Sequence, residues 1–116
     1  MSETRLMKEI QFQVTKLGHR VFRNNVGFAK TKNGCPIKFG LCVGSSDLIG
    51  WTTIEITDKM VGKKIAVFTA LEIKIENGII KAEQQNFINE VNRAGGIGRV
   101  LRSVTDLYEE LHNLWK

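Results

Sequence analysis

The order of predicted elements indicates an α/β fold with a mixed sheet. A helical pattern comes first, three or so extended segments follow, and a helix, a short strand and a last helix complete the 116 residues. The strand–helix–strand unit near the C-terminus favours a parallel crossover, whereas a turn between the second and third extended segments allows them to pair antiparallel. We therefore expect an α/β protein whose central mixed sheet is flanked by helices.

Apolar residues recur at helical spacing close to the N-terminus, at Leu6, Ile10, Val14 and Leu17. Ser2 is a suitable N-cap for this segment, because its hydroxyl can accept a hydrogen bond from a backbone N–H of the first turn. Gly18 is a suitable end, because glycine readily adopts the left-handed conformation that follows many helices. The first helix is therefore predicted from Glu3 to Leu17.

The extended segments are residues 20–29, 47–57 and 65–75. The first is interrupted by the polar step Asn24-Asn25, which indicates an irregularity in the strand. Two polar segments separate the strands: residues 30–36 predict a loop, since they contain Asn33-Gly34 and Pro36, and residues 58–64 predict a turn.

After the turn signal Asn77-Gly78, a second helix is predicted from Ala82 to Ala94, where Gly95-Gly96 ends it. Its expected buried face consists of Phe87, Ile88 and Val91. Gln84 lies one turn earlier on that face and should point inward, whereas Gln85 falls about 100° away and should be exposed. An inward amide suits a water, a carboxylate or a phosphate oxygen, and it suits equally the backbone groups at a helix start.

A short strand is predicted from Gly98 to Arg102, and a last helix follows it. Ser103 and Asp106 resemble a capping box at the start of that helix. Its apolar stripe comprises Val104, Leu107, Tyr108, Leu111 and Leu114. One apolar stripe is typical of a helix that packs on a core, and we expect this helix to do so.

The composition bounds the class of protein. A chain of 116 residues with 25% charged and 42% hydrophobic residues predicts a single globular domain, residues 1–116. No apolar stretch approaches the ~20 residues of a membrane span, and the N-terminus lacks the apolar core of a signal peptide, so we expect a cytoplasmic protein without a membrane partner. Cys35 and Cys42 should behave as small hydrophobes, with a disulfide as the alternative. Isolated histidines argue against structural zinc.

The net charge of +5 and the isoelectric point near 9.4 suit a polyanionic partner, because lysine and arginine gain affinity by neutralising phosphates. The basic residues are spread along the chain, however, so an ordinary solvated surface explains them equally well. The predicted loop over residues 30–36 contains two lysines and is a candidate for contacting a ligand.

Two carboxylates and a lysine stand on successive predicted strands: Asp47 on one, Glu72 and Lys74 on the next. Successive side chains of a strand point to opposite faces, so Glu72 and Lys74 share a face of an otherwise apolar strand. If the two strands pair antiparallel, Asp47 comes near Glu72. Two carboxylates about 4 Å apart repel by roughly 4 kcal/mol at an effective dielectric near 20, and a divalent cation reverses that sign. The pattern predicts a metal site, with an ordinary Glu72–Lys74 ion pair as the alternative.

These residues resemble a known family. The segments that carry the likeness are Gly44-Ser-Ser-Asp47, Glu72-Ile-Lys74, Glu83-Gln84-Gln-Asn-Phe87-Ile, Gly95-Gly96 and Val100-Leu-Arg-Ser103. Their order and spacing look like those of the stand-alone virus-type replication-repair nuclease (VRR-NUC) domain of the PD-(D/E)xK nuclease superfamily, and the likeness extends back to Arg23-Asn-Asn-Val-Gly27. Ser46 stands where the superfamily name has proline. The resemblance implies a restriction-endonuclease-like α-β-β-β-α-β core with a C-terminal helix.

The resemblance also implies roles for individual residues. Asp47 and Glu72 would bind Mg²⁺ or Mn²⁺, with the backbone carbonyl of Ile73 as a further ligand. Lys74 would orient or activate the attacking water, and Gln84 matches the family's glutamine on the helix after the active-site strand. The expected catalytic residues are thus Asp47, Glu72, Lys74 and Gln84.

Glu9 on the first helix is similar to an acidic residue that sometimes completes such metal sites, with a solvated helix glutamate as the alternative. Whether one or two metals act depends on this residue. The expected DNA contacts are Arg23, Asn25, Lys30, Lys32 and Arg102.

The expected activity is that of a Mg²⁺- or Mn²⁺-dependent, structure-selective DNA endonuclease that hydrolyses phosphodiester bonds. The resemblance implies a homodimer that resolves Holliday junctions or other branched DNA during repair in a bacterial cell, encoded by the cell or by a phage. The main alternative is a DNA-binding module of the same fold with little or no catalysis. A structural partner protein is a third class.

Overall fold

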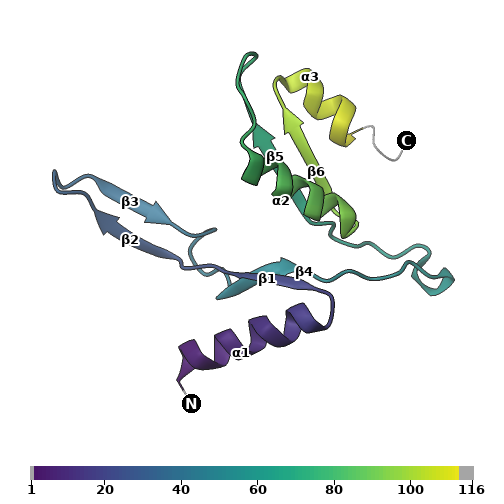
Figure 1. Cartoon of the computed structure of the whole chain (residues 1–116), viewed down its shortest axis with the longest axis horizontal. Helices are drawn as coiled ribbons and strands as arrows, with labels where there is room; N and C mark the ends of the chain where they lie inside the picture. The colour runs from purple at the N-terminus through teal and green to yellow at the C-terminus, as the bar shows by residue number, and fades with distance from the viewer. Residues whose placement is uncertain (1, 113–116) are drawn as a thin grey trace. The chain divides into compact units, whose positions relative to one another are not determined.

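The computed structural model describes residues 2–112, which divide into two compact units, with the boundary along the chain between Ile54 and Glu55 (Figure 1). Each unit contains helix and strand, which confirms the predicted α/β class. In the described part of the chain, no helix has the length and apolar character that a bilayer crossing requires.

The N-terminal unit contains α1 (Glu3–Lys16), β1 (Arg20–Arg23), β2 (Gly27–Lys30), β3 (Pro36–Phe39) and β4 (Leu48–Trp51). The first helix begins and ends close to the predicted residues. Ser2 Oγ accepts a hydrogen bond from the backbone N–H of Arg5 at 3.1 Å, and Gly18 adopts a φ of 90° after the last turn. The predicted cap and stop are both confirmed.

The predicted strand over residues 20–29 is two strands with different partners. β1 pairs antiparallel with β4, with Phe22 opposite Ile49, whereas β2 pairs antiparallel with β3, with Phe28 opposite Lys38. The chain changes partner at Asn24-Asn25, where the irregularity was predicted. The expected loop over residues 30–36 is correct only for residues 31–35, because Pro36 already belongs to β3.

β4 is shorter than the predicted strand over residues 47–57. It ends at Trp51, whose ring lies 5.6 Å from that of Phe22 on β1, and residues 52–57 form no regular element. β1 has only four residues, so its pairing ends at Trp51 as well. Residues 52–57, despite the β-propensity of several of them, therefore form no strand in the described part of the chain.

The C-terminal unit contains the 3₁₀ turn η1 (Asp58–Met60), β5 (Thr69–Ile73), α2 (Ala82–Arg93), β6 (Ile97–Leu101), α3 (Val104–Leu107) and the π-helical turn η2 (Tyr108–His112). β5 and β6 pair in parallel, with Glu72 opposite Val100, and α2 makes the crossover between them. The predicted strand–helix–strand unit is confirmed. Its core is formed by Ile88, Val91, Ile97 and Leu101.

Two glycines allow α2 to approach the parallel strands closely. A Cβ on Gly98 would lie 2.8 Å from the carbonyl oxygen of Ile88, and one on Gly96 would lie 2.8 Å from a side-chain carbon of Val91. The side-chain amide of Asn92 then bonds both backbone groups of Gly98, at 2.8 and 3.0 Å. The helix and β6 are therefore joined by packing and by hydrogen bonds at the same position.

Three predictions for this unit need correction. The strand over residues 65–75 is regular only from Thr69 to Ile73, and Phe87, expected on the buried face of α2, is 40% exposed. In the last helix, Ser103 caps as predicted by accepting from the N–H of Asp106, but Val104 is 72% exposed. The stripe was expected to pack on a core, and four residues of α-helix are too few to bury it. The side chains of Leu111 and Leu114 lie outside the described part.

The described residues form three two-stranded sheets, of which two are antiparallel and one is parallel. A single central mixed sheet, antiparallel pairing of the strand after Asp47 with the strand of Glu72, and one domain over residues 1–116 would all require the two units to pack together. These three expectations stay predictions. Cys35 and Cys42 are both free, so the alternative of a disulfide between them is not realised, and both are exposed.

Candidate active site

Glu72 on β5 and Lys74, the first residue after β5, lie on the same side of the chain, as the strand period predicts. Lys74 Nζ lies 3.5 Å from Glu72 Oε1, and the two side chains are 17% and 30% exposed, respectively. The neighbouring Ile73, on the opposite face, is 68% exposed. The face with the charged pair is therefore less exposed than the face with Ile73, because α2 lies against it.

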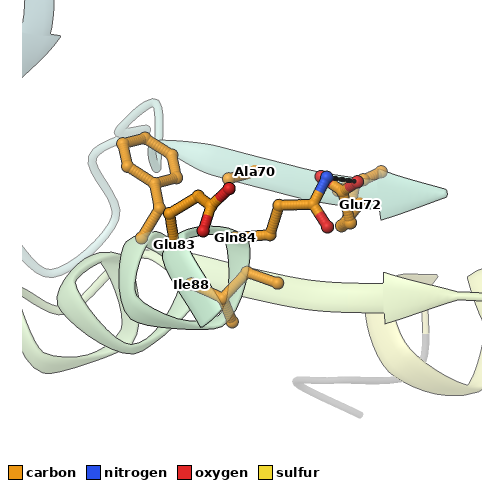
Figure 2. Close-up of a pocket in the computed structure, with 7 residues that line it drawn as sticks. Ala70, Glu72, Glu83, Gln84 and Ile88 are labelled. Carbon is orange, nitrogen blue, oxygen red and sulfur yellow. Dashed lines mark hydrogen bonds between the residues drawn. The ribbon is translucent and has the colours of Figure 1, made fainter. Parts of the chain in front are cut away.

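The sequence left open whether the Gln84 amide bonds a carboxylate or the backbone at the start of α2, and in the structure it bonds both. Its Oε1 accepts a hydrogen bond at 3.0 Å from the backbone N–H of Lys81, the N-cap residue of α2, and its Nε2 donates to Glu72 Oε1 at 2.8 Å (Figure 2). Because the backbone N–H can only donate, it fixes which end of the amide carries oxygen. The start of the helix therefore directs the amide N–H₂ group at the carboxylate. Gln85 is exposed and bonds Asn89 instead, as predicted.

One oxygen of Glu72 is thus held and the other is free. Both the Gln84 hydrogen bond and the Lys74 contact involve Oε1, whereas no hydrogen bond or ion pair within the described part of the C-terminal unit occupies Oε2. The backbone N–H of Lys74 bonds Leu101 on β6, so the carbonyl of the preceding Ile73 faces the opposite edge of β5. A carboxylate oxygen and a carbonyl oxygen are hard ligands, and this donor set fits Mg²⁺ or Mn²⁺.

A cavity of about 360 Å³ opens beside this group. It is lined by Ala70, Leu71, Glu72, Glu83, Gln84, Phe87 and Ile88. Figure 2 shows the side chain of Gln84 reaching from α2 toward Glu72, while the carboxylate of Glu83 lies on the other side of Gln84. The cavity therefore has an apolar wall, a polar corner where Gln84 meets Glu72, and a second carboxylate, that of Glu83, among its lining residues.

Asp47 lies at the end of a loop that Asn24 holds in place. The backbone N–H of Asn24 donates to the carbonyl of Asp47 at 2.8 Å, and its side-chain amide bonds Leu41, Ser45 and Ser46 at distances of 2.7 to 2.9 Å. The sequence pattern did not predict this role, because in it Asn24 indicates only an irregularity in a strand. The polar pair Asn24-Asn25 inside an apolar strand is the signal that points to it.

The remaining predicted residues have the following surroundings. Arg23 Nε donates to Asn25 Oδ1 at 3.0 Å, so these two expected DNA contacts lie together. Lys30 ends β2 and Lys32 follows in the hairpin loop; both are exposed, as is Glu9 on α1. Arg102 Nη1 bonds the backbone carbonyls of residues 75, 76 and 78 at 2.9 to 3.2 Å, which leaves this group engaged in holding the turn after β5.

Within residues 2–112, no three His, Cys, Asp or Glu side chains gather as a ready metal cluster. Asp47 and Glu9 belong to the N-terminal unit, and Glu72 belongs to the C-terminal unit. The structure thus brings together Glu72, Lys74 and Gln84 of the predicted catalytic set. A shared site with Asp47 stays a prediction.

Comparison with known proteins identifies the family. The sequence profile of the VRR-NUC domain matches residues 37–105, which is more than half of the chain and includes Asp47, Glu72, Lys74 and Gln84. No curated protein and no solved structure matches the chain. The motif resemblance and the profile match agree from the loop that contains Asp47 to Ser103. The chain therefore belongs to the VRR-NUC family and carries a nuclease-type, DNA-processing domain.

Proposed function

We propose that this protein is a divalent-metal-dependent, structure-selective DNA endonuclease that hydrolyses phosphodiester bonds. The observation that supports the proposal most directly is the state of Glu72. Gln84 and Lys74 hold one of its oxygens, while its second oxygen is free to bind a cation. The family gives the substrate class, DNA, and the donor set gives Mg²⁺ or Mn²⁺ as the cation.

Glu72 and the Ile73 carbonyl would hold the metal, with Asp47 completing the site once the two units come together. Bound Mg²⁺ or Mn²⁺ supplies an activated water and offsets charge on the phosphoryl oxygens. Lys74 contributes a fixed positive charge beside Glu72, where it can orient the attacking water or stabilise negative charge that develops during the reaction. Gln84 is a positioning residue, because it fixes the rotation of the Glu72 carboxylate from the start of α2.

We further propose that the preferred substrate is branched DNA, including Holliday junctions, and that the active form is a homodimer. A 13.1-kDa chain with one candidate site needs a second copy to cut two strands symmetrically. No recognition helix or base-reading motif is apparent in the sequence, which favours recognition of DNA shape. The alternative is a DNA-binding module with little or no catalysis.

The test is cleavage of four-way junction, flap, duplex and single-stranded DNA with and without Mn²⁺. Glu72→Gln and Lys74→Met should reduce cleavage by about 100-fold or more, since each removes a charge needed in the transition state. DNA binding in EDTA should change less than about threefold, because neither residue is a proposed phosphate contact.

Glu90→Gln is the matched control, since it makes the same change on the exposed surface of α2. It should cleave like the wild type. Metal-independent cleavage, or loss of binding in parallel with cleavage in the Glu72 variant, would exclude the proposed roles. Binding of DNA without any cleavage by the wild type would favour the alternative.

A further inference from the structure

The β2–β3 hairpin has two unlike faces. Phe28 lies directly opposite Lys38 in the antiparallel register, and Lys30, two residues along β2, shares their face. The other face carries Gly27, Ala29, Ile37 and Phe39. Pro36, opposite Lys30, completes this first face; all four of its side chains are exposed, and Phe28 is 59% exposed. A solvated strand face that combines two lysines with a phenylalanine is not built for burial in a core.

The charge around the hairpin is one-sided. Residues 10–46 contain no Asp or Glu but six Lys and Arg, although twelve acidic residues occur in the whole chain. Among the described residues of the N-terminal unit, no carboxylate pairs with Lys30, Lys32 or Lys38. The VRR-NUC match begins only at Ile37, so most of this basic segment, including β2, lies outside the matched range. Unpaired lysines on an acid-free segment fit a polyanion.

We propose that the Phe28–Lys38 face of the hairpin binds unpaired nucleotides of the DNA substrate. Lys30 and Lys38 contact phosphates, and Phe28 stacks on an exposed base. Lysines alone would bind any DNA, because every strand carries phosphates. An exposed aromatic ring gains a stacking partner only where a base face is accessible, and in a paired duplex the base faces are covered by their neighbours. Among branched DNAs, the Phe28 contact therefore adds affinity for those with unpaired bases, such as flaps and bubbles, and leaves the affinity for fully paired four-way junctions unchanged.

The opposite face provides an internal control. The ring of Phe39 lies across Gly27, where a Cβ would come within 2.4 Å of the ring carbons, so this aromatic side chain already has a partner within the hairpin. Phe39 is 45% exposed and belongs to the same hairpin, yet it points away from the lysines. It has the same side-chain chemistry as Phe28 without the proposed contact.

The test measures binding of the full-length protein by fluorescence anisotropy in EDTA. The probes are a bubble duplex, a flap, a fully paired duplex and a fully paired four-way junction, with a single-stranded oligonucleotide as the fifth. Phe28→Leu keeps an apolar side chain but cannot stack, and it should weaken binding roughly tenfold on the probes with unpaired bases. Binding of the two fully paired probes should change less than about twofold. Phe28→Trp, which can still stack, should keep the wild-type preference for probes with unpaired bases.

Phe39→Leu should leave the preference for unpaired bases intact, and circular dichroism should show that all variants remain folded. Lys30→Gln with Lys38→Gln should weaken binding of every probe. On a single strand, the slope of log K against log salt concentration should become shallower by roughly 0.7 for each phosphate that the variant no longer neutralises. Equal losses for Phe28→Leu on paired and unpaired probes would overturn the stacking role. Equal effects of the Phe28 and Phe39 variants would overturn it as well.

The inference takes DNA as the partner from the proposed function, but its test does not depend on cleavage. A protein that binds unpaired DNA through Phe28 and fails to cut with Mn²⁺ would refute the nuclease proposal and leave the hairpin role standing. A protein that cuts DNA while Phe28→Leu binds every probe normally would refute the hairpin role alone.

Discussion

Gln84 links the start of α2 to the Glu72 carboxylate through a single side chain. Its position on the inward face of α2 could be predicted from helical spacing alone, but the spacing left open whether its amide served the helix start or a ligand. The amide has two ends, and in the structure each end has one of these partners. Orientation of Glu72 therefore depends on formation of the first turn of α2.

Replacing Gln84 by methionine should remove both hydrogen bonds while nearly preserving side-chain volume. We expect a loss of about 1–2 kcal/mol in the free energy of unfolding, measured by urea denaturation, because two hydrogen bonds are lost. Cleavage should fall as well, since the Glu72 carboxylate is then free to rotate. The same change at the exposed Gln85 should cost less than about 0.5 kcal/mol. Equal costs at the two positions would contradict the assignment.

The role of Asn24 in holding the loop before Asp47 was not predicted from the sequence. Its side chain bonds Leu41, Ser45 and Ser46, so it ties the strand irregularity to the loop that ends at Asp47. Asn24→Leu should destabilise the protein by about 1–3 kcal/mol, because backbone groups of the loop lose their partners. The backbone N–H of Leu41 donates to Asn24 Oδ1 and should exchange with solvent faster in the variant, which NMR hydrogen exchange can measure. Asn25→Leu is the control, and continued protection of the Leu41 amide in Asn24→Leu would exclude this role.

At the scale of elements, α1, α2 and the parallel β5–β6 unit were predictable, whereas the antiparallel pairings of β1 with β4 and of β2 with β3 were not. Ser2 and Gly18 bound α1 within a residue of the prediction, because capping depends on local backbone chemistry. The hairpin of β2 and β3 was missed because four residues with Pro36 at one end carry little periodicity. Thr52 to Thr57 carry β-propensity without forming a strand, since strand formation depends on a partner that local sequence does not specify.

The contact between α2 and β6 gives a prediction at this scale. Gly98→Ala should force the two elements apart, because the added Cβ would lie 2.8 Å from the carbonyl oxygen of Ile88. Overpacking of this kind costs about 1–3 kcal/mol, and urea denaturation followed by circular dichroism can measure it. Asn86→Ala, on the exposed surface of α2, is the control and should change the free energy of unfolding by less than about 0.5 kcal/mol. A Gly98 variant as stable as the control would show that the helix can shift without penalty.

At the scale of the molecule, the two units differ in how their acidic residues are distributed. The acid-free segment of residues 10–46 lies in the N-terminal unit, whereas Glu72 and its two partners lie in the C-terminal unit. In the proposed function, phosphate contacts belong largely to the N-terminal unit and the metal ligand Glu72 to the C-terminal unit. Asp47 is the one acidic residue of the N-terminal unit within the range that the VRR-NUC profile matches. Spacing along the sequence predicts that Asp47 approaches Glu72, and because the two residues belong to different units this approach stays a prediction.

A double-mutant cycle for Mn²⁺ binding tests whether Asp47 and Glu72 form one site. Asp47→Asn, Glu72→Gln and the double variant are compared by electron paramagnetic resonance, which counts free Mn²⁺ without any need for cleavage. If both carboxylates bind the same ion, either substitution should remove most of the affinity and the second should add little, so the losses are strongly non-additive. Carboxylates that bind separate ions would give additive losses, and the proposed active site would be wrong. Glu9→Gln belongs in the same cycle, because coupling of a third carboxylate would extend the site toward two metals, whereas an uncoupled Glu9 would leave it as a solvated residue of α1.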